Sequence, residues 1–260
     1  NEGSASMVSW NWRANGGTTS TNTTGSIDST VQVDPSGGFS IVTWTGAAGS
    51  WGTLGTVGHG LSAAPTVIFA KTRSGTGEWC CFFSSYGEAS IGGSNAASNK
   101  LQLNVHDALY TNQSYADFGK VMPDSDKFTV NGNLINNSGT TVVAYCFTNI
   151  EGYIKSGTYF GNANDDGPFL YTGFKPAFFL CKPILTGNWR IQDNKRTTFN
   201  VADKTLFPNA TTVEESNDSQ YLDILSNGIK LRANDANFNQ ATTFVYLAMA
   251  ENPFKYATAR

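Results

Sequence analysis

Hydrophobic residues occur along this chain in short segments, which are bounded by Gly, Pro, Asn and Asp. Some segments alternate apolar and polar positions, as strands with one buried face do. Others, at residues 66–70 and 177–181, are apolar throughout except for Thr66, which is typical of strands covered on both faces. No segment keeps a helical period of 3.6 residues over several turns. The pattern therefore predicts an all-β protein.

This strand pattern occurs twice in the chain. The segment from Pro65 to Lys71 matches the segment from Pro176 to Lys182 with the same spacing. Further segments match in the same order, namely 39–46 with 153–161, 125–130 with 226–231, and 142–147 with 244–249. We therefore predict two tandem antiparallel β-sandwich repeats, jelly-roll-like in type, at residues 1–152 and 153–260. Pro65 should correspond to Pro176, and Lys71 to Lys182.

The first residues of the chain resemble the end of a repeat. Residues 7–12 resemble the closing segment 142–147, and a stretch rich in Gly, Thr, Ser and Asn follows at 15–30. We expect a strand at 7–12, which either closes a third copy upstream or pairs within one of the two modules. Residues 15–30 are expected to form a linker or a long surface excursion.

Charge and composition exclude several classes of function. The net charge is −3 and no run of Lys or Arg occurs, which argues against nucleic acid as a partner. No apolar stretch is long enough for insertion into a membrane. Because no metal-binding spacing of Cys and His occurs, the four cysteines are predicted to be buried free thiols: Cys80, Cys81, Cys146 and Cys181.

Several motifs together resemble a known family. They include Gly-Phe-Ser-Ile-Val-Thr-Trp-Thr-Gly at 38–46, Asp-Gly-Pro-Phe-Leu-Tyr-Thr-Gly-Phe-Lys-Pro at 166–176, and Ala-Glu-Asn-Pro-Phe-Lys-Tyr-Ala-Thr-Ala-Arg at 250–260. The chain resembles, over nearly its whole length, the C-terminal module of large virion proteins of tailed bacteriophages, especially those of marine bacteria and cyanobacteria. The resemblance implies a tail-fibre or other virion surface component, with other virion proteins as partners. It supplies no catalytic residues.

Catalytic signals are weak. No nucleophile elbow, zinc-protease motif or phosphate-binding loop occurs. Glu78, Asp165 and Asp166 are candidates for paired glycosidase carboxylates, but the two aspartates lie in a Gly- and Asn-rich stretch that favours a solvated turn. His59, between two glycines, is interpreted as a local hydrogen-bonding residue rather than a base. We predict that the chain is not an enzyme and binds no cofactor.

A calcium loop is the alternative interpretation of one turn. Asn162, Asn164 and Asp166 place oxygen atoms at alternate positions, and Gly167 follows as sixth residue. The bidentate acid expected at position twelve is absent, because Gly173 occupies that place. A plain turn without metal is the favoured interpretation.

Trp51 is the candidate ligand-binding residue. Trp44, Trp79 and Trp189 have aromatic counterparts in the other repeat, so they are predicted to be core residues. Trp51 lies in a loop that is longer in the first repeat than in the second, between Gly49 and Gly52. An exposed indole on such a loop stacks on sugar rings or inserts into a partner chain, and the alternative is a contact with another subunit or with the core. The other diverged insertions are at 86–98, 107–124 and 195–220.

Three functions remain open at this point. The first is host attachment by a tail fibre or surface fibre, through a host-surface glycan or protein. The second is a purely structural role in a head decoration, head fibre or fibre spacer. The third is a carbohydrate-binding module of a secreted protein. Because closed symmetry hides sheet edges, we also expect self-association, as a homotrimer, on the virion surface.

Overall fold

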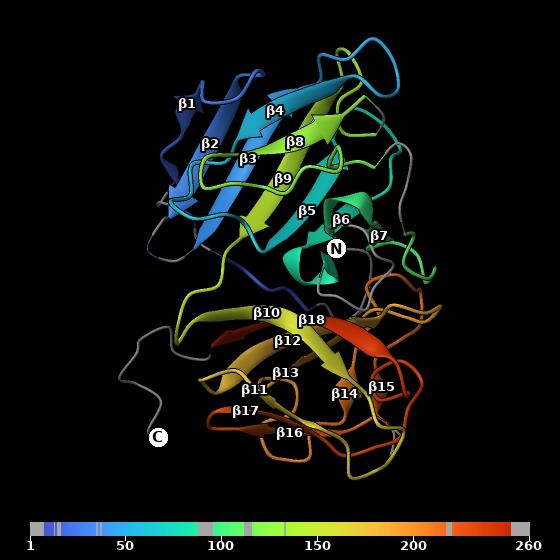
Figure 1. Ribbon diagram of the computed structural model, residues 1–260. Coiled ribbons are helices and arrows are strands. Elements are labelled where there is room, and N and C mark those ends of the chain that lie inside the picture. Colours follow the sequence, from blue (N-terminus) through green and yellow to red (C-terminus); the bar gives the residue numbers. More distant parts are fainter. Residues whose placement is uncertain are drawn as a thin grey trace, which may run out of the picture.

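A computed structural model describes residues 8–12, 14, 17–34, 36, 38–87, 96–111, 116–132, 134–216 and 220–250. These residues form an all-β structure with several antiparallel sheets, as the hydrophobic pattern predicts. Figure 1 shows the strands up to β9 in one half of the molecule and the strands from β10 in the other. Within the described residues, each sheet takes its strands from one half only.

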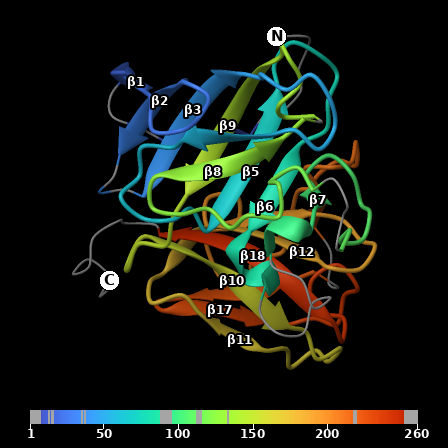
Figure 2. The ribbon, with the colours of Figure 1, turned by 45° about the horizontal axis from the view of Figure 1, so that its top comes forward.

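The first half is built around a seven-stranded sheet with the order β1-β2-β3-β9-β5-β6-β7, over which β4 and β8 form a second layer. Figure 2 shows β4 and β8 lying across this sheet. Two short 3₁₀ helices, η2 (Ser84–Gly87) and η3 (Ala96–Ser98), follow β6. The strands are β1 (Ser20–Asn22), β2 (Ser29–Asp34), β3 (Phe39–Thr45), β4 (Leu54–Gly58), β5 (Val67–Thr72), β6 (Cys80–Phe83), β7 (Leu101–Gln102), β8 (Lys127–Asn131) and β9 (Thr141–Phe147).

The second half has a four-stranded sheet with the order β10-β18-β12-β13, packed on a three-stranded sheet with the order β11-β17-β16. A small ladder of β14 and β15 lies beside them. The strands are β10 (Ile154–Phe160), β11 (Phe169–Tyr171), β12 (Pro176–Pro183), β13 (Arg190–Asp193), β14 (Lys204–Thr205), β15 (Glu215–Ser216), β16 (Leu222–Leu225), β17 (Gly228–Leu231) and β18 (Thr243–Ala250).

The two halves have the same strand order in their central sheets. The sequence β3-β9-β5-β6 in the first half corresponds to β10-β18-β12-β13 in the second, and the pair β4–β8 corresponds to β11–β17. The registers agree as well, because Lys71 lies opposite Val143 on β9 and Lys182 lies opposite Val245 on β18. Matched segments of the sequence therefore occupy corresponding strands.

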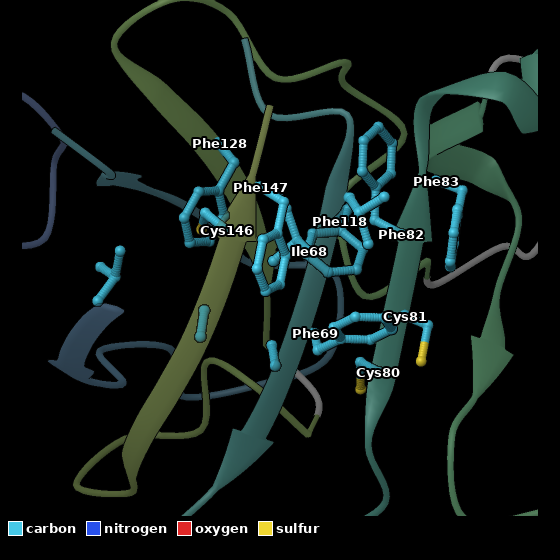
Figure 3. Packing of buried hydrophobic residues seen from close by; sticks show 14 of the residues in the cluster. Ile68, Phe69, Cys80, Cys81, Phe82, Phe83, Phe118, Phe128, Cys146 and Phe147 are labelled. Atoms are coloured by element: carbon cyan, nitrogen blue, oxygen red, sulfur yellow. The ribbon is translucent and has the colours of Figure 1, made fainter. Parts of the chain in front are cut away.

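The two central sheets pack face to face and share one core. On one face of the first sheet, Phe82 contacts Phe118, which in turn contacts Phe128 of β8, so this face belongs to the first sandwich (Figure 3). On the other face, Phe83 lies 6.2 Å from Trp189 of the second half, ring centroid to ring centroid. Strands β5 and β12 are thus covered on both sides, which explains their continuous apolar runs.

The start of the chain differs from the prediction. Residues 8–12 form no strand; instead Trp12 lies between Phe147 and Phe178, one from each half. The predicted linker at 15–30 contains β1 and the first residues of β2, in its described part. In β1, at the edge of the sheet, Ser20 and Thr21 pair their backbone with β2 and stay exposed, whereas Ser29 of β2 is buried.

Candidate functional site

The Trp51 side chain lies on the surface, as predicted, with 59% of its area exposed. Its loop is held at the base by hydrogen bonds from the Gly52 N–H to Asn131 Oδ1 (3.0 Å) and from the Thr53 N–H to the Ser50 carbonyl (3.3 Å). Gly52 has a φ of 84°, a conformation that glycine adopts without strain. The loop therefore presents a large indole on an anchored backbone.

The candidate calcium turn is the counterpart of the Trp51 loop in the second half. Both loops are anchored by a buried Asn: Asn136 Oδ1 accepts from the Ala47 N–H, and Asn239 Oδ1 accepts from the Asn162 N–H. When the two halves are aligned by the register of the flanking strands, the Trp51 loop is two residues longer than its counterpart. The two candidate sites thus occupy corresponding ends of the two sandwiches.

The side chains of this turn are engaged in local bonds. Asn162 Oδ1 accepts from the Asn164 N–H, and Asn164 Oδ1 accepts from the Asp166 N–H, at 3.1 and 2.9 Å. Asp166 forms an ion pair with Lys230 (2.6 Å), and this ammonium holds the pKa of the carboxyl group below its usual value. Side-chain oxygen atoms that accept backbone N–H groups two residues further along the chain are typical of an ordinary turn. In the described part of the chain, no group of three or more His, Cys, Asp or Glu residues is placed to hold a metal ion.

His59 stabilises a turn rather than facing a cleft. Its ring is fully buried, and Nδ1 accepts from the Leu61 N–H at 3.1 Å, so Nε2 carries the proton and donates to the Asp124 carbonyl, also at 3.1 Å. Burial lowers the pKa of His59. In the second half, the Thr172 hydroxyl makes the corresponding contact with the Phe174 N–H (3.4 Å). Thr172, which has no acid–base function, therefore takes the structural place of His59 in the second half.

The candidate carboxylates do not converge. Glu78 pairs with Lys100 (3.6 Å) in the first half, whereas Asp165 accepts a hydrogen bond from the Asn234 N–H (2.9 Å) in the second. The four cysteines are free and buried, as predicted. Burial raises the pKa of Cys146 to about 12 and that of Cys181 to about 11, so neither thiol is a ready nucleophile.

Between the two central sheets lies an aromatic cavity of about 400 Å³ that the sequence did not reveal. Its walls come from both halves, and the N-terminal segment 10–12 lies at its side. Trp79 stacks on Tyr145 within it, and the Arg196 guanidinium lies over the Trp10 ring at 6.0 Å. No single strand pattern indicated this cavity, because its lining is assembled from segments far apart in the chain.

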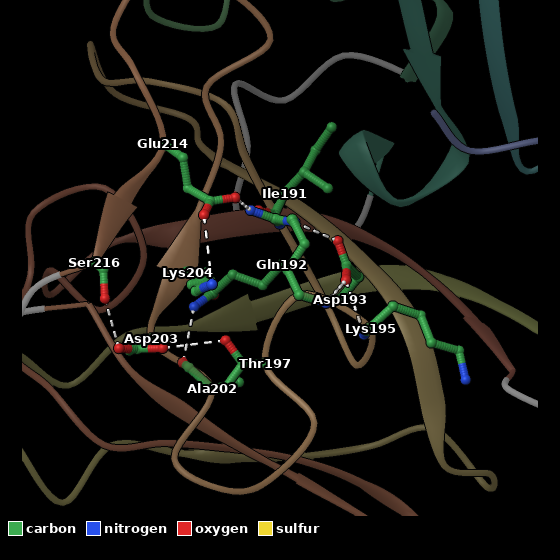
Figure 4. A network of polar contacts seen from close by, with 11 residues as sticks. Ile191, Gln192, Asp193, Lys195, Thr197, Ala202, Asp203, Lys204, Glu214 and Ser216 are labelled. Atoms are coloured by element: carbon green, nitrogen blue, oxygen red, sulfur yellow. Dashed lines mark hydrogen bonds and ion pairs between the residues drawn. The ribbon is translucent and has the colours of Figure 1, made fainter. Parts of the chain in front are cut away.

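Polar side chains surround the neighbouring edge of the second half (Figure 4). Arg196 bridges Asp193 (2.6 Å) and Glu214 (2.8 Å), while Asp203 accepts hydrogen bonds from the Thr197 and Ser216 hydroxyls. Backbone and guanidinium donors hold the pKa of Asp193 below its usual value, against the effect of burial. Each acid here is paired, so the network fixes the loop 194–203 in place.

A second, smaller cavity of about 300 Å³ lies on the side of the second half where β10 and β11 are edge strands. It is lined by residues 149–151, 154–155 and 171–173. We call it the open-side pocket. In the first half, the corresponding place is filled by β2, whose Val31 and Val33 approach Gly60.

The family of the chain follows from a match over nearly its full length. A family model described as Domain of unknown function (DUF7483) matches residues 1–253. The chain belongs to this family. Because the match spans both sandwiches, the two-half arrangement lies within a single family domain. No curated protein and no solved structure matches the chain. No helix in the described residues is long and apolar enough to cross a membrane.

Proposed function

We propose that this chain is a non-catalytic module of a virion surface fibre, and that it attaches the particle to a host-surface glycan or protein. The observation that carries the proposal is the Trp51 indole, exposed on a loop whose base is fixed by Asn131. Loops on a rigid sandwich are common positions for binding residues, and an exposed Trp has a large apolar face for a sugar or a protein.

The sequence motifs at 38–46, 166–176 and 250–260 support the virion assignment, since they resemble C-terminal modules of tailed-phage virion proteins. The local roles of His59, Glu78 and Asp165 support a binding module over an enzyme, because each group is engaged in the fold. Self-association as a homotrimer and contacts with other virion proteins remain predictions of this proposal.

Trp51→Ala tests the proposal. Stacking of one sugar ring on an indole contributes about 1 kcal/mol, or roughly fivefold in affinity per site. Because a particle binds through many copies, this loss is multiplied. Particles that carry Trp51→Ala should therefore adsorb to the host bacterium more slowly, while the purified chain keeps its thermal stability.

The matched control is Phe199→Ala, since Phe199 is 84% exposed and lies in the second half. It should adsorb like the wild type. Unchanged adsorption of the Trp51 variant would refute the assigned role. A loss of several kcal/mol of stability, as for truncation of a buried Trp, would make Trp51 a structural residue instead.

A further inference from the structure

The open-side pocket lies where, among the described residues, the second half has no counterpart of β2. In the first half, β2 pairs with β3, and residues 26–27 pair with the edge of β4 through the bond from the Ile27 N–H to the Thr56 carbonyl (3.0 Å). In the second half, the corresponding strands β10 and β11 each lie at the edge of a sheet. The connection from β9 to β10 is too short to contain another strand, since it covers residues 148–153.

Three residues adapt this side of the second half to the missing strand. The Asn149 side chain accepts from the Ser156 N–H (2.7 Å) and donates to the Ser156 carbonyl (3.3 Å). Its amide thus makes the hydrogen bonds that the backbone of a neighbouring strand would make. Lys155 is exposed at the register position where the first half has the fully buried Ser40. A charge at such a position opposes pairing with a further strand.

Tyr171 is the third adaptation. It corresponds to Gly58 of the first half, where a Cβ atom would lie only 2.1 Å from Asn22 of the covering segment. The Tyr171 ring lies over Gly173, whose φ of 85° is a glycine conformation, and its side chain is 65% exposed. A strand placed as in the first half would collide with this ring, so the pocket is not a vacant strand site.

We propose that the open-side pocket is a saccharide-binding site, in which one sugar ring stacks on Tyr171. The volume of about 300 Å³ suits one or two sugar rings. Glu151 and Lys155 line the same space and bring an acceptor and a donor to it, whereas the Asn149 amide is held by Ser156. Because the lining contains one acidic and one basic residue, a neutral polyhydroxylated ligand fits it better than a phosphate.

The aromatic surface continues beyond the pocket. Phe169 is 45% exposed and lies two residues before Tyr171 on β11, so both side chains are on the same face of the strand, roughly 7 Å apart along it. The Phe169 ring covers Gly228 of the neighbouring strand. A second ring of an oligosaccharide can thus contact Phe169. This inference depends neither on Trp51 nor on the virion assignment.

The test is an NMR titration of the full chain with glucose, galactose, N-acetylglucosamine and their β-linked disaccharides. At least one of these sugars should shift the backbone amides of residues 149–155 and 171–173. Tyr171→Ala should weaken its binding by about fivefold to tenfold, and Tyr171→Trp should retain it. Phe199→Ala and Trp51→Ala should leave it unchanged.

Three results would overturn the proposal. They are the absence of binding of every sugar at tens of millimolar, shifts confined to other residues, and equal losses in the Tyr171→Ala and Phe199→Ala variants. Concentration-dependent dimerisation that protects the β10 amides from exchange would assign the surface to a second chain instead. If the sugar titration succeeds while Trp51→Ala has no effect on adsorption, only the proposed attachment role fails.

Discussion

Lys71 and Lys182 share a register position but differ in their surroundings. The first side chain is partly buried and donates to the Gly77 carbonyl. The second is fully buried between the halves, where Nζ donates to the carbonyls of Pro183 and Leu185, both at 3.0 Å. Burial lowers the pKa of Lys182 to about 8 from 10.5. Burial of the charged ammonium therefore costs free energy at Lys182.

This cost depends on pH. Between pH 8 and pH 10.5 the unfolded chain binds more protons at Lys182 than the folded chain, so stability rises with pH in this window. Relative to Lys182→Met, the wild-type free energy of unfolding should increase by up to about 3 kcal/mol across it. Urea denaturation at a series of pH values measures the difference. Lys71→Met is the control, and an equal effect in both variants would disprove the assignment to Lys182.

Among the local elements, the turn after β4 and the turn after β11 have the same geometry with different side chains. Gly60 and Gly173 both have positive φ values, and the residue before each accepts a hydrogen bond from the residue after it. In the first half the acceptor is His59, whose ring also packs on Phe128 with centroids 6.5 Å apart. The turn thus needs a side-chain acceptor, and an imidazole supplies it as well as a hydroxyl does.

The buried imidazole gives this turn a pH dependence. Because burial lowers the pKa of His59, the unfolded chain takes up a proton near pH 6.5 while the folded chain does not. Stability is therefore lost as pH falls through this value. His59→Thr, which copies the second half, should remove that slope between pH 7 and pH 5 in urea denaturation. His106→Thr, at the other histidine, should retain it; a retained slope in the His59 variant would contradict the prediction.

In the whole molecule, the shared core joins the two sandwiches. Ser156 and Thr66 are hydrogen-bonded across the interface (2.9 Å), and Trp189 donates to the Gln102 carbonyl (2.7 Å) while remaining fully buried. Its register counterpart Trp79 is only partly buried, on the wall of the aromatic cavity. Related positions in the two halves thus contribute unequally to the interface.

Trp189→Ala should destabilise the protein by about 3–5 kcal/mol, because it removes a fully buried indole and leaves the Gln102 carbonyl without its donor. Trp79→Ala should cost less. Since one core spans both halves, calorimetry of the wild type should show a single unfolding transition. Two resolved transitions would show that the halves are energetically independent, and equal costs for the two substitutions would contradict the unequal roles of the two indoles.

Much of the fold follows from local sequence. Strand positions depend on the alternation of apolar residues and on Gly, Pro and Asn at turns, which are properties of a few neighbouring residues. The buried thiols and the exposure of Trp51 were predictable for the same reason. The strand residues within 20–30 were not, because their Ser and Thr side chains have no apolar periodicity and their strand structure comes from pairing with neighbouring strands.

The all-β class, the matched strand segments and the candidate loops can be inferred from the order of residues along the chain. The common core of the two halves, the position of residues 8–12 between them, and the edge positions of β10 and β11 among the described strands depend on how distant segments pack. The open-side pocket likewise lies where the described part of the second half has no counterpart of β2. Packing between distant segments has no signature in the local sequence, because burial of one face depends on which distant segment packs against it.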